Sequence, residues 1–252
     1  MSKSKSVRTR GRTNLWRTFL IATVLVAVIA GAAGVGAFSA TRSEADDRPA
    51  TRTYAQPQHV DGTTVTYGKP TAKHTLSVYL DPRCPYCADV ENALGKTMTR
   101  QADAGRYKIE YHFATFLDGA LGGKGSKRAV NALGAAANES PAKFAAYLGV
   151  LYANHPAEES DDKFGSTATL LELADEVAGL RTPAFNKAVK ELTYLPWVEK
   201  VSAAFYGSGE TGTPVVKLDG KPVDVLSGTG DAMSPDAFTK LVGSRLKDTP
   251  RP

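Results

Sequence analysis

Two cysteines separated by two residues are the feature of this 252-residue chain that most directly suggests chemistry. Cys84 and Cys87 enclose Pro85 and Tyr86, and the sequence contains no other cysteine. A thiolate attacks a disulfide through a mixed-disulfide intermediate, and a second thiol at this spacing can resolve that intermediate. The pair therefore predicts thiol–disulfide exchange. The redox group would be the Cys84–Cys87 disulfide itself, without a separate cofactor.

A structural role or a metal site accounts for the pair less well. A disulfide between residues three apart closes a very small loop, so it stabilises a fold little through chain entropy. Two thiols do not complete a zinc site, and the four histidines show no ligand spacing with them, so no metal is expected. An inert pair of buried cysteines is the structural alternative that the sequence leaves open.

The residues around the pair predict a strand that leads into a helix. Thr75–Leu80, TLSVYL, is a short apolar run typical of a buried strand. Pro85 suits a first helical turn, where its missing N–H is not needed. Beyond Cys87, apolar and amide side chains recur at helical spacing, at Val90, Leu94, Met98 and Gln101. Cys84 is then expected at the N-cap of this helix.

A helix N-terminus gives the two cysteines different roles. The helix dipole and the free N–H groups favour a thiolate at Cys84, which predicts a lowered pKa and a nucleophile. Cys87 lies one turn further on, is expected to be less exposed, and would be the resolving thiol. Arg83 would add positive potential if its side chain pointed toward the sulfur.

The remaining pattern predicts two αβ halves separated by helices. Alternation and turn residues indicate strands at Gly62–Gly68, Tyr107–Thr115, Thr213–Leu218 and Pro222–Leu226, the last two joined as a hairpin through Asp219-Gly220. Residues from roughly 120 to 207 are largely helical, with helix starts at Thr182 and Pro196, and a C-terminal helix starts at Ser234. The order is a β-α-β half, a helical insertion and a β-β-α half.

A proline follows Thr213 at the start of a predicted strand, about 130 residues after the cysteines. Proline is tolerated at a strand start, and a trans bond is the general expectation for any X–Pro pair. A cis Thr213–Pro214 bond would let Thr213 offer backbone groups to an extended substrate.

Together these parts resemble the thioredoxin superfamily, and more closely the DsbA-like thiol–disulfide oxidoreductases of bacterial cell envelopes. The resemblance covers roughly 60–247 and is carried by three features: the C-P-Y-C motif after a strand, Thr213-Pro214 before the hairpin, and the helical insertion. It implies a thioredoxin-like α/β fold with an inserted all-helical subdomain at about 120–195, and a cis Pro214 beside the disulfide. Substrate contacts would fall to Pro85, Tyr86, Thr213 and Pro214.

The same resemblance implies partners and leaves the direction of the reaction open. Substrates would be reduced or unfolded secreted proteins, and a membrane redox partner would re-oxidise the cysteine pair. Some family members carry a buried acid six residues before the first cysteine, where this chain has Val78, and the nearest acid here is Asp81. The Pro85-Tyr86 dipeptide also occurs in glutaredoxin-like reductases.

The N-terminal segment predicts the compartment. Phe19 to Phe38 form a 20-residue uncharged run, long enough as a helix to span a bilayer, and residues 1–18 before it contain six basic side chains. This charge pattern places the N-terminus inside and the body outside the cytoplasm. The alternative is a cleaved signal peptide ending near Ala37-Phe38-Ser39, which would yield a secreted protein. Residues 39–59 are polar and read as a flexible linker, and residues 248–252 as a short tail.

Composition narrows the function. The formal net charge of +5 falls to −1 when the six basic residues before Phe19 are left out, so the folded body is not expected to bind nucleic acid. The leading hypothesis is an enzyme that introduces or exchanges disulfides in extracytoplasmic proteins. The alternatives are a membrane-tethered reductase or isomerase, and a non-catalytic, chaperone-like peptide-binding module.

Overall fold

The computed structural model describes residues 54–248. The predicted membrane-spanning run at 19–38, the basic tail and most of the linker lie outside these residues. Within the described part of the chain, no helix is long and apolar enough to cross a membrane.

One mixed sheet of six strands forms the centre of the fold. Its strands are β1 (Val60–Asp61), β2 (Thr64–Tyr67), β3 (Thr75–Leu80), β4 (Lys108–Phe113), β5 (Val215–Leu218) and β6 (Lys221–Pro222). Their order is β1-β2-β4-β3-β5-β6, and only β3 and β4 are parallel neighbours. The alternating burial of β3 and β4 follows from their sequence, since every second side chain is apolar and faces the helices.

Helix α1 (Pro85–Asp103) connects the two parallel strands and completes a β-α-β unit. Its buried face includes Val90, Leu94 and Met98, which lie at helical spacing. Helix α8 (Pro235–Asp248) follows the β5–β6 hairpin, and its Phe238 and Val242 are fully buried. The predicted β-α-β and β-β-α halves are therefore confirmed.

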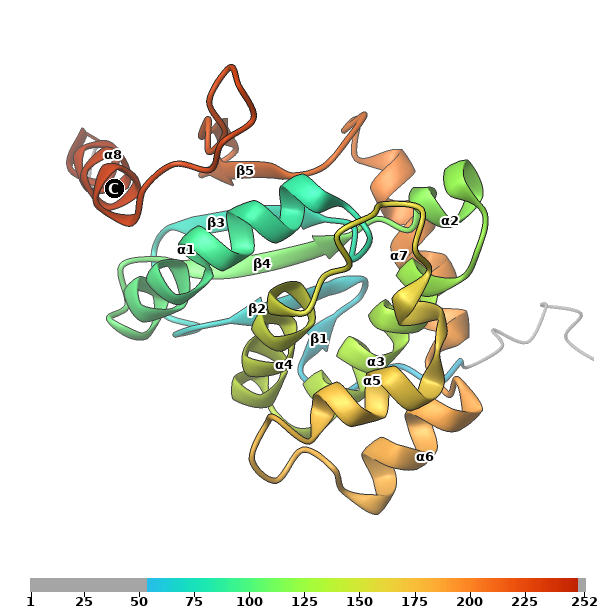
Figure 1. Cartoon of the computed structure of the whole chain (residues 1–252). Coiled ribbons are helices and arrows are strands. Elements are labelled where there is room, and N and C mark those ends of the chain that lie inside the picture. Colours follow the sequence, from blue (N-terminus) through green and yellow to red (C-terminus); the bar gives the residue numbers. More distant parts are fainter. Residues whose placement is uncertain (1–53, 249–252) are drawn as a thin grey trace, which may run out of the picture. The chain divides into compact units, whose positions relative to one another are not determined.

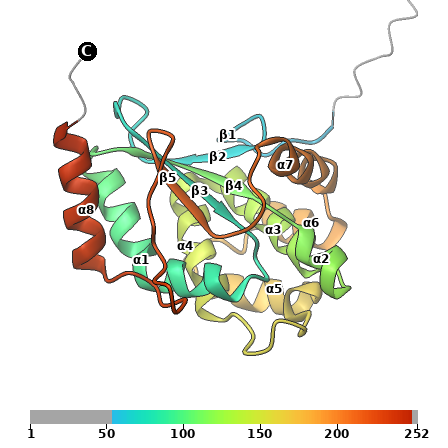
Figure 2. The same ribbon diagram turned by 90° about the horizontal axis from the view of Figure 1, so that it is seen from above.

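The insertion between the halves is all-helical. It contains α2 (Phe116–Leu121), α3 (Gly125–Glu139), α4 (Pro141–Ala153), a 3₁₀ turn at Lys163–Gly165, α5 (Thr167–Ala174), α6 (Pro183–Glu191) and α7 (Leu195–Gly207). Figures 1 and 2 show α3–α6 gathered together and α8 away from them, with α1 between α4 and α8 and in contact with both. Thr182 caps α6 as predicted, because its hydroxyl accepts a hydrogen bond from the Phe185 N–H.

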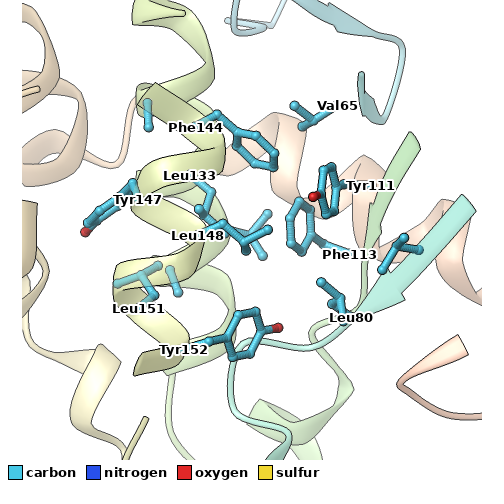
Figure 3. Close-up of a cluster of buried hydrophobic side chains, with 14 of the residues drawn as sticks. Val65, Leu80, Tyr111, Phe113, Leu133, Phe144, Tyr147, Leu148, Leu151 and Tyr152 are labelled. Carbon is cyan, nitrogen blue, oxygen red and sulfur yellow. The ribbon is translucent and has the colours of Figure 1, made fainter. Parts of the chain in front are cut away.

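Aromatic packing joins the insertion to the sheet. Figure 3 shows Tyr111 and Phe113 of β4 facing Phe144 and Leu148 of α4. The Phe144 ring meets Tyr111 edge-on at 5.2 Å and Phe113 at 6.1 Å between centroids. Such contacts add to the burial of apolar area, so β4, the strand that follows α1, is fixed against the insertion.

All four predicted strands outside Thr75–Leu80 are shorter in the structure, and the two strands of the β5–β6 hairpin differ for identifiable reasons. The strand expected at Thr213–Leu218 starts at Val215, because Pro214 has no N–H to contribute to the ladder. The partner expected at Pro222–Leu226 is wrong beyond Pro222: Val223 still donates to Val216 O at 2.8 Å, but Leu226 bridges Ala232 instead. The Asp219-Gly220 turn forms as expected, with both residues at positive φ.

Candidate active site

The two cysteines lie at the start of α1, where the sequence predicts them. Cys84 is the N-cap with extended backbone angles, φ −78° and ψ 119°, and Pro85 follows as the first helical residue. Cys84 O accepts hydrogen bonds from the N–H groups of Cys87 at 3.1 Å and Ala88 at 3.2 Å. The first turn is therefore closed around the pair, and the proline costs no hydrogen bond there.

Both residues are free thiols, and they differ in burial. Cys84 is 5% exposed, whereas Cys87 is fully buried. Cys84 Sγ donates a hydrogen bond to the backbone oxygen of Thr213 at 3.5 Å, across 129 residues of sequence. The outer thiol is thus the one that faces the loop before β5.

The pKa values of the two thiols are shifted in opposite directions. The pKa of Cys84 is lowered, chiefly by the hydrogen bond from Cys87, with further lowering by the Thr213 side chain and the Cys87 N–H. Burial and the negative charge of Asp81 act against this lowering. Burial raises the pKa of Cys87 well above its usual value, and the hydrogen bond with Cys84 adds to the effect. These directions agree with the expected lowered pKa at Cys84, while the roles of nucleophile and resolving thiol stay predictions.

Thr213 contributes more than its backbone. The Thr213–Pro214 peptide is cis, as the family resemblance implies. The Thr213 hydroxyl oxygen is buried and has no hydrogen-bond partner among the described residues. It nevertheless favours the charged form of both cysteines, which indicates that its O–H is placed to donate to a thiolate once one forms.

The Arg83 side chain points away from the sulfurs. The guanidinium is 1% exposed and bonds Gly122 O at 2.7 Å and Asp118 Oδ1 at 3.3 Å, with Asp162 Oδ1 at 3.6 Å. Because its charge is used in this way, Arg83 is not among the groups that lower the pKa of Cys84. The idea that it supplies positive potential to the thiol is therefore wrong, and its role is to tie the active-site turn to the segment between α2 and α3.

Asp81 is a buried acceptor immediately before the active-site turn. One carboxylate oxygen accepts from Ser126 Oγ at 2.5 Å and from the Arg83 N–H at 3.0 Å, and the other accepts from the Leu117 N–H at 3.2 Å. Burial raises the pKa of this carboxyl to about 6, although the three hydrogen bonds oppose the rise. The Tyr152 hydroxyl also donates to Asp81 O at 3.1 Å, which fixes the backbone from which the turn starts.

Of the residues expected to contact substrate, Tyr86 is 51% exposed, and the Thr213 carbonyl lies beside Cys84. Pro85 is half-buried and opens α1. Whether Pro85, Tyr86, Thr213 and Pro214 bind substrate stays a prediction. Among residues 54–248 no cluster of three or more metal-ligating side chains occurs.

Sequence reasoning missed two features of this region. The first is a pair of carboxylates, Asp118 of α2 and Asp162 before the 3₁₀ turn, which lie far apart in the sequence. In the structure Asp118 accepts from the Ser126 and Lys127 N–H groups and Asp162 from those of Lys124 and Gly125, so both carboxylates fix the start of α3. The second feature is Glu91, which is buried one turn beyond Cys87.

Comparison with known proteins agrees with this geometry. The family model described as thioredoxin matches residues 60–243, and the chain belongs to this family. Its thioredoxin-like fold is shared with solved thiol–disulfide oxidoreductases of the DsbA type, among them DsbA of Mycobacterium tuberculosis.

Several solved structures share the fold at low sequence identity. The thiol–disulfide oxidoreductase MdbA of Actinomyces oris is 22% identical with a TM-score of 0.61, over 80% of this chain and 93% of that one. BdbD of Bacillus subtilis is 21% identical with a TM-score of 0.60, over 77% of this chain and 97% of that one. Reduced DsbA of Mycobacterium tuberculosis is 24% identical with a TM-score of 0.59, over 75% of this chain and 95% of that one. No curated protein sequence matches significantly.

Proposed function

We propose that the chain is a membrane-tethered oxidoreductase that introduces or exchanges disulfides in extracytoplasmic proteins through Cys84 and Cys87. The observation that carries the proposal is the asymmetry of the pair, with a lowered pKa at the outer thiol and a raised pKa at the buried one. A stabilised thiolate favours the reduced form of the enzyme, and a dithiol whose reduced form is stabilised is an oxidant of other thiols.

The reaction follows from which sulfur can be reached. A substrate thiolate attacks Cys84 Sγ of the Cys84–Cys87 disulfide, a mixed disulfide forms, and Cys87 leaves as a thiolate that takes up a proton. A second substrate thiolate then attacks the substrate sulfur of the mixed disulfide and releases Cys84. The substrate has lost two electrons to the pair, and a membrane redox partner must remove them to restore the disulfide.

Substrate would lie against the exposed Tyr86 ring and the Thr213-Pro214 segment. Tyr86 offers half of its surface to solvent beside the nucleophile. The Thr213 carbonyl is 3.5 Å from Cys84 Sγ, close to any chain joined to that sulfur. Reduced or unfolded secreted proteins fit this arrangement, because their extended segments can use backbone hydrogen bonds without a fixed sequence.

The location rests on the sequence of the first 59 residues. Six basic side chains precede the apolar run at 19–38, which favours an anchor with the N-terminus inside and the catalytic body outside. An oxidising compartment is also where a disulfide donor can operate.

The first test is the reduction potential of the full-length chain, equilibrated in glutathione buffers and quantified by thiol alkylation. We expect a value above about −200 mV, on the oxidising side of glutaredoxins. A value at or below about −270 mV, where thioredoxin lies, would contradict the oxidase assignment and favour a reductase.

Two single-cysteine variants test the assigned roles. Cys87→Ser should accumulate a mixed disulfide between Cys84 and a substrate, since the resolving thiol is missing. The matched variant Cys84→Ser should accumulate none. If Cys84→Ser retained its protein partners as well as the wild type and exchange activity were never detected, the chain would be a non-catalytic binding module.

A further inference from the structure

A cleft between α1 and α4, separate from the cysteine pair, holds the least explained polar group of the described structure. The cleft has a volume of about 550 Å³, within the range of small-molecule sites. The wall of the cleft on α4 is a stripe of small residues at helical spacing: Ala142, Ala145, Ala146, Gly149 and Ala153. Helix α1 adds one more small residue, Gly95.

Glu91 lies in this cleft without a partner. Its side chain belongs to α1, the residue is 6% exposed, and its Oε2 atom is buried with no hydrogen-bond donor among the described residues. A buried carboxylate without a partner is costly, so such a group is expected to be neutral or to be satisfied by something that binds.

Gly95 shows where the carboxyl lies. A Cβ atom on Gly95 would collide with Glu91 Oε1, so the carboxyl folds over the helix at that position. Glycine inside a helix costs about 1 kcal/mol relative to alanine, and here its missing side chain leaves room for the acid. The acid and the small-residue wall therefore belong to one cleft.

Hydrogen bonds define both ends of the cleft. At the end near the cysteines, Asn92 Nδ2 donates to Tyr152 O at 3.1 Å and joins α1 to α4. At the other end, the Tyr67 hydroxyl donates to Asp103 Oδ1 at 2.9 Å. Tyr111 of β4 has a buried hydroxyl that also lacks a hydrogen-bond partner among the described residues, and the negative charge of Glu91 contributes to its raised pKa.

We propose that the α1–α4 cleft binds a ligand with an apolar body and an aliphatic ammonium head, whose N–H groups pair with the Glu91 carboxylate. The small-residue wall would contact the apolar body, and the ammonium would supply the hydrogen-bond donor and the charge that Glu91 lacks. The ammonium can belong to a free amine or to a lysine side chain of an apolar peptide, since both present the same group.

The pairing makes binding depend on pH. Burial alone raises the pKa of Glu91 to about 7, so the carboxyl is mostly neutral at pH 6 and mostly charged at pH 8, while an aliphatic ammonium stays protonated. The charge-bearing groups around Glu91 are Tyr67 of β2, Tyr111 of β4, Tyr152 of α4, Lys96 of α1 and Glu176 after α5. The three tyrosines have raised pKa values and stay neutral in this range, and Lys96 and Glu176 are exposed.

The test titrates n-butylammonium chloride into the full-length, oxidised chain in nanodiscs of zwitterionic lipid, with ¹³C-methyl alanine as the reporter. Oxidation removes the cysteine thiols from the titration. We expect saturable shifts at Ala142, Ala145, Ala146 and Ala153, with affinity rising about tenfold from pH 6 to pH 8 as the ionised fraction of Glu91 rises. A peptide Ala-Leu-Lys-Leu-Ala, tested in parallel, separates a peptide source from a free amine.

Variants separate the proposal from nonspecific partitioning. Glu91→Gln should reduce affinity at pH 8 at least tenfold, and Gly149→Leu should fill the cleft, since a Cβ there meets no atom within 4 Å. The rim variants Glu176→Gln and Lys96→Gln should retain affinity within about twofold. Equal binding by wild type and Glu91→Gln, equal binding of butyrate, or no saturable shift at the four alanines would overturn the proposal. Unchanged alanine signals outside the cleft would show that each variant is folded.

Discussion

The Thr213 hydroxyl offers the sharpest test of how the protein stabilises the Cys84 thiolate. Thr213→Val keeps the shape of the side chain and the backbone oxygen that accepts from Cys84 Sγ, and removes only the hydroxyl. In the dithiol form that hydroxyl is buried without a partner, so its loss costs the neutral form nothing. The hydroxyl acts to lower the pKa of both cysteines, so its loss should destabilise the thiolate form.

The magnitude follows from one hydrogen bond to a charged group. Such a bond contributes about 1.5–3 kcal/mol, and for a two-electron couple about 1.4 kcal/mol corresponds to 30 mV. The reduction potential of Thr213→Val should therefore fall by about 30–65 mV, because the reduced, thiolate-bearing form is no longer stabilised. The pH at which Cys84 reaches half of its maximal alkylation rate should rise in the same variant.

The assay is equilibration of wild type and variant in the same glutathione buffers, followed by alkylation and mass measurement. Thr213→Ser is the matched control, since it keeps the hydroxyl and loses only a methyl group, and its potential should stay within about 10 mV of the wild type. If Thr213→Val had an unchanged or more positive potential while Thr213→Ser behaved as the wild type, the hydroxyl would not be a donor to the thiolate.

Three further predictions concern buried groups near the site. The folded-state pKa of Glu91 is raised from 4.5 to about 7, so the folded protein binds a proton more tightly than the unfolded chain and loses stability as pH rises through this interval. Glu91→Gln should therefore raise the urea-derived free energy of unfolding by about 3 kcal/mol at pH 8 and change it little at pH 4.5; an equal gain at both pH values would refute the assignment. Gly95→Ala should destabilise the wild type but stabilise a Glu91→Ala background by about 1 kcal/mol, because the collision with the carboxyl is then gone; the same sign in both backgrounds would show that this contact is absent. Arg83→Met should cost about 3–5 kcal/mol in thermal or urea unfolding, since Asp118 is left buried without its cation, and a cost under about 1 kcal/mol would contradict the network.

The sequence predicted the parts of the site that depend on local pattern. Thr75–Leu80 is a short apolar run typical of a buried strand, Pro85 marks a first helical turn, and these two signals place Cys84 at an N-cap. Thr182-Pro183 identified the start of α6 for the same reason. Local patterns were sufficient there because capping and strand alternation involve residues within a few positions of each other.

Other features depend on partners far apart in the chain. Arg83 donates to Gly122 O and pairs with Asp118, and no local sequence pattern predicts these contacts. The end of the β5–β6 hairpin was also misplaced, since the segment after Val223 leaves the sheet to bridge Ala232. Glu91 did give a signal: with Cys87, Leu94 and Met98 it lies at i, i+4, i+7 and i+11, which puts an acid on the apolar stripe of α1.

The residue at position 78 bears on how the thiol asymmetry arises. Val78 is fully buried in β3 and carries no charge. The acidic group near the cysteine pair is Asp81, whose two carboxylate oxygens already accept three hydrogen bonds. Asp81 raises the pKa of Cys84 and therefore opposes the thiolate. The lowered pKa must then come from donors alone: the Cys87 thiol and N–H within the first turn of α1, and the Thr213 hydroxyl in the segment before β5. Because two of these donors belong to Cys87 itself, the C-P-Y-C turn supplies most of the lowering of the Cys84 pKa, and Thr213 is the one contributor that can be removed without changing that turn.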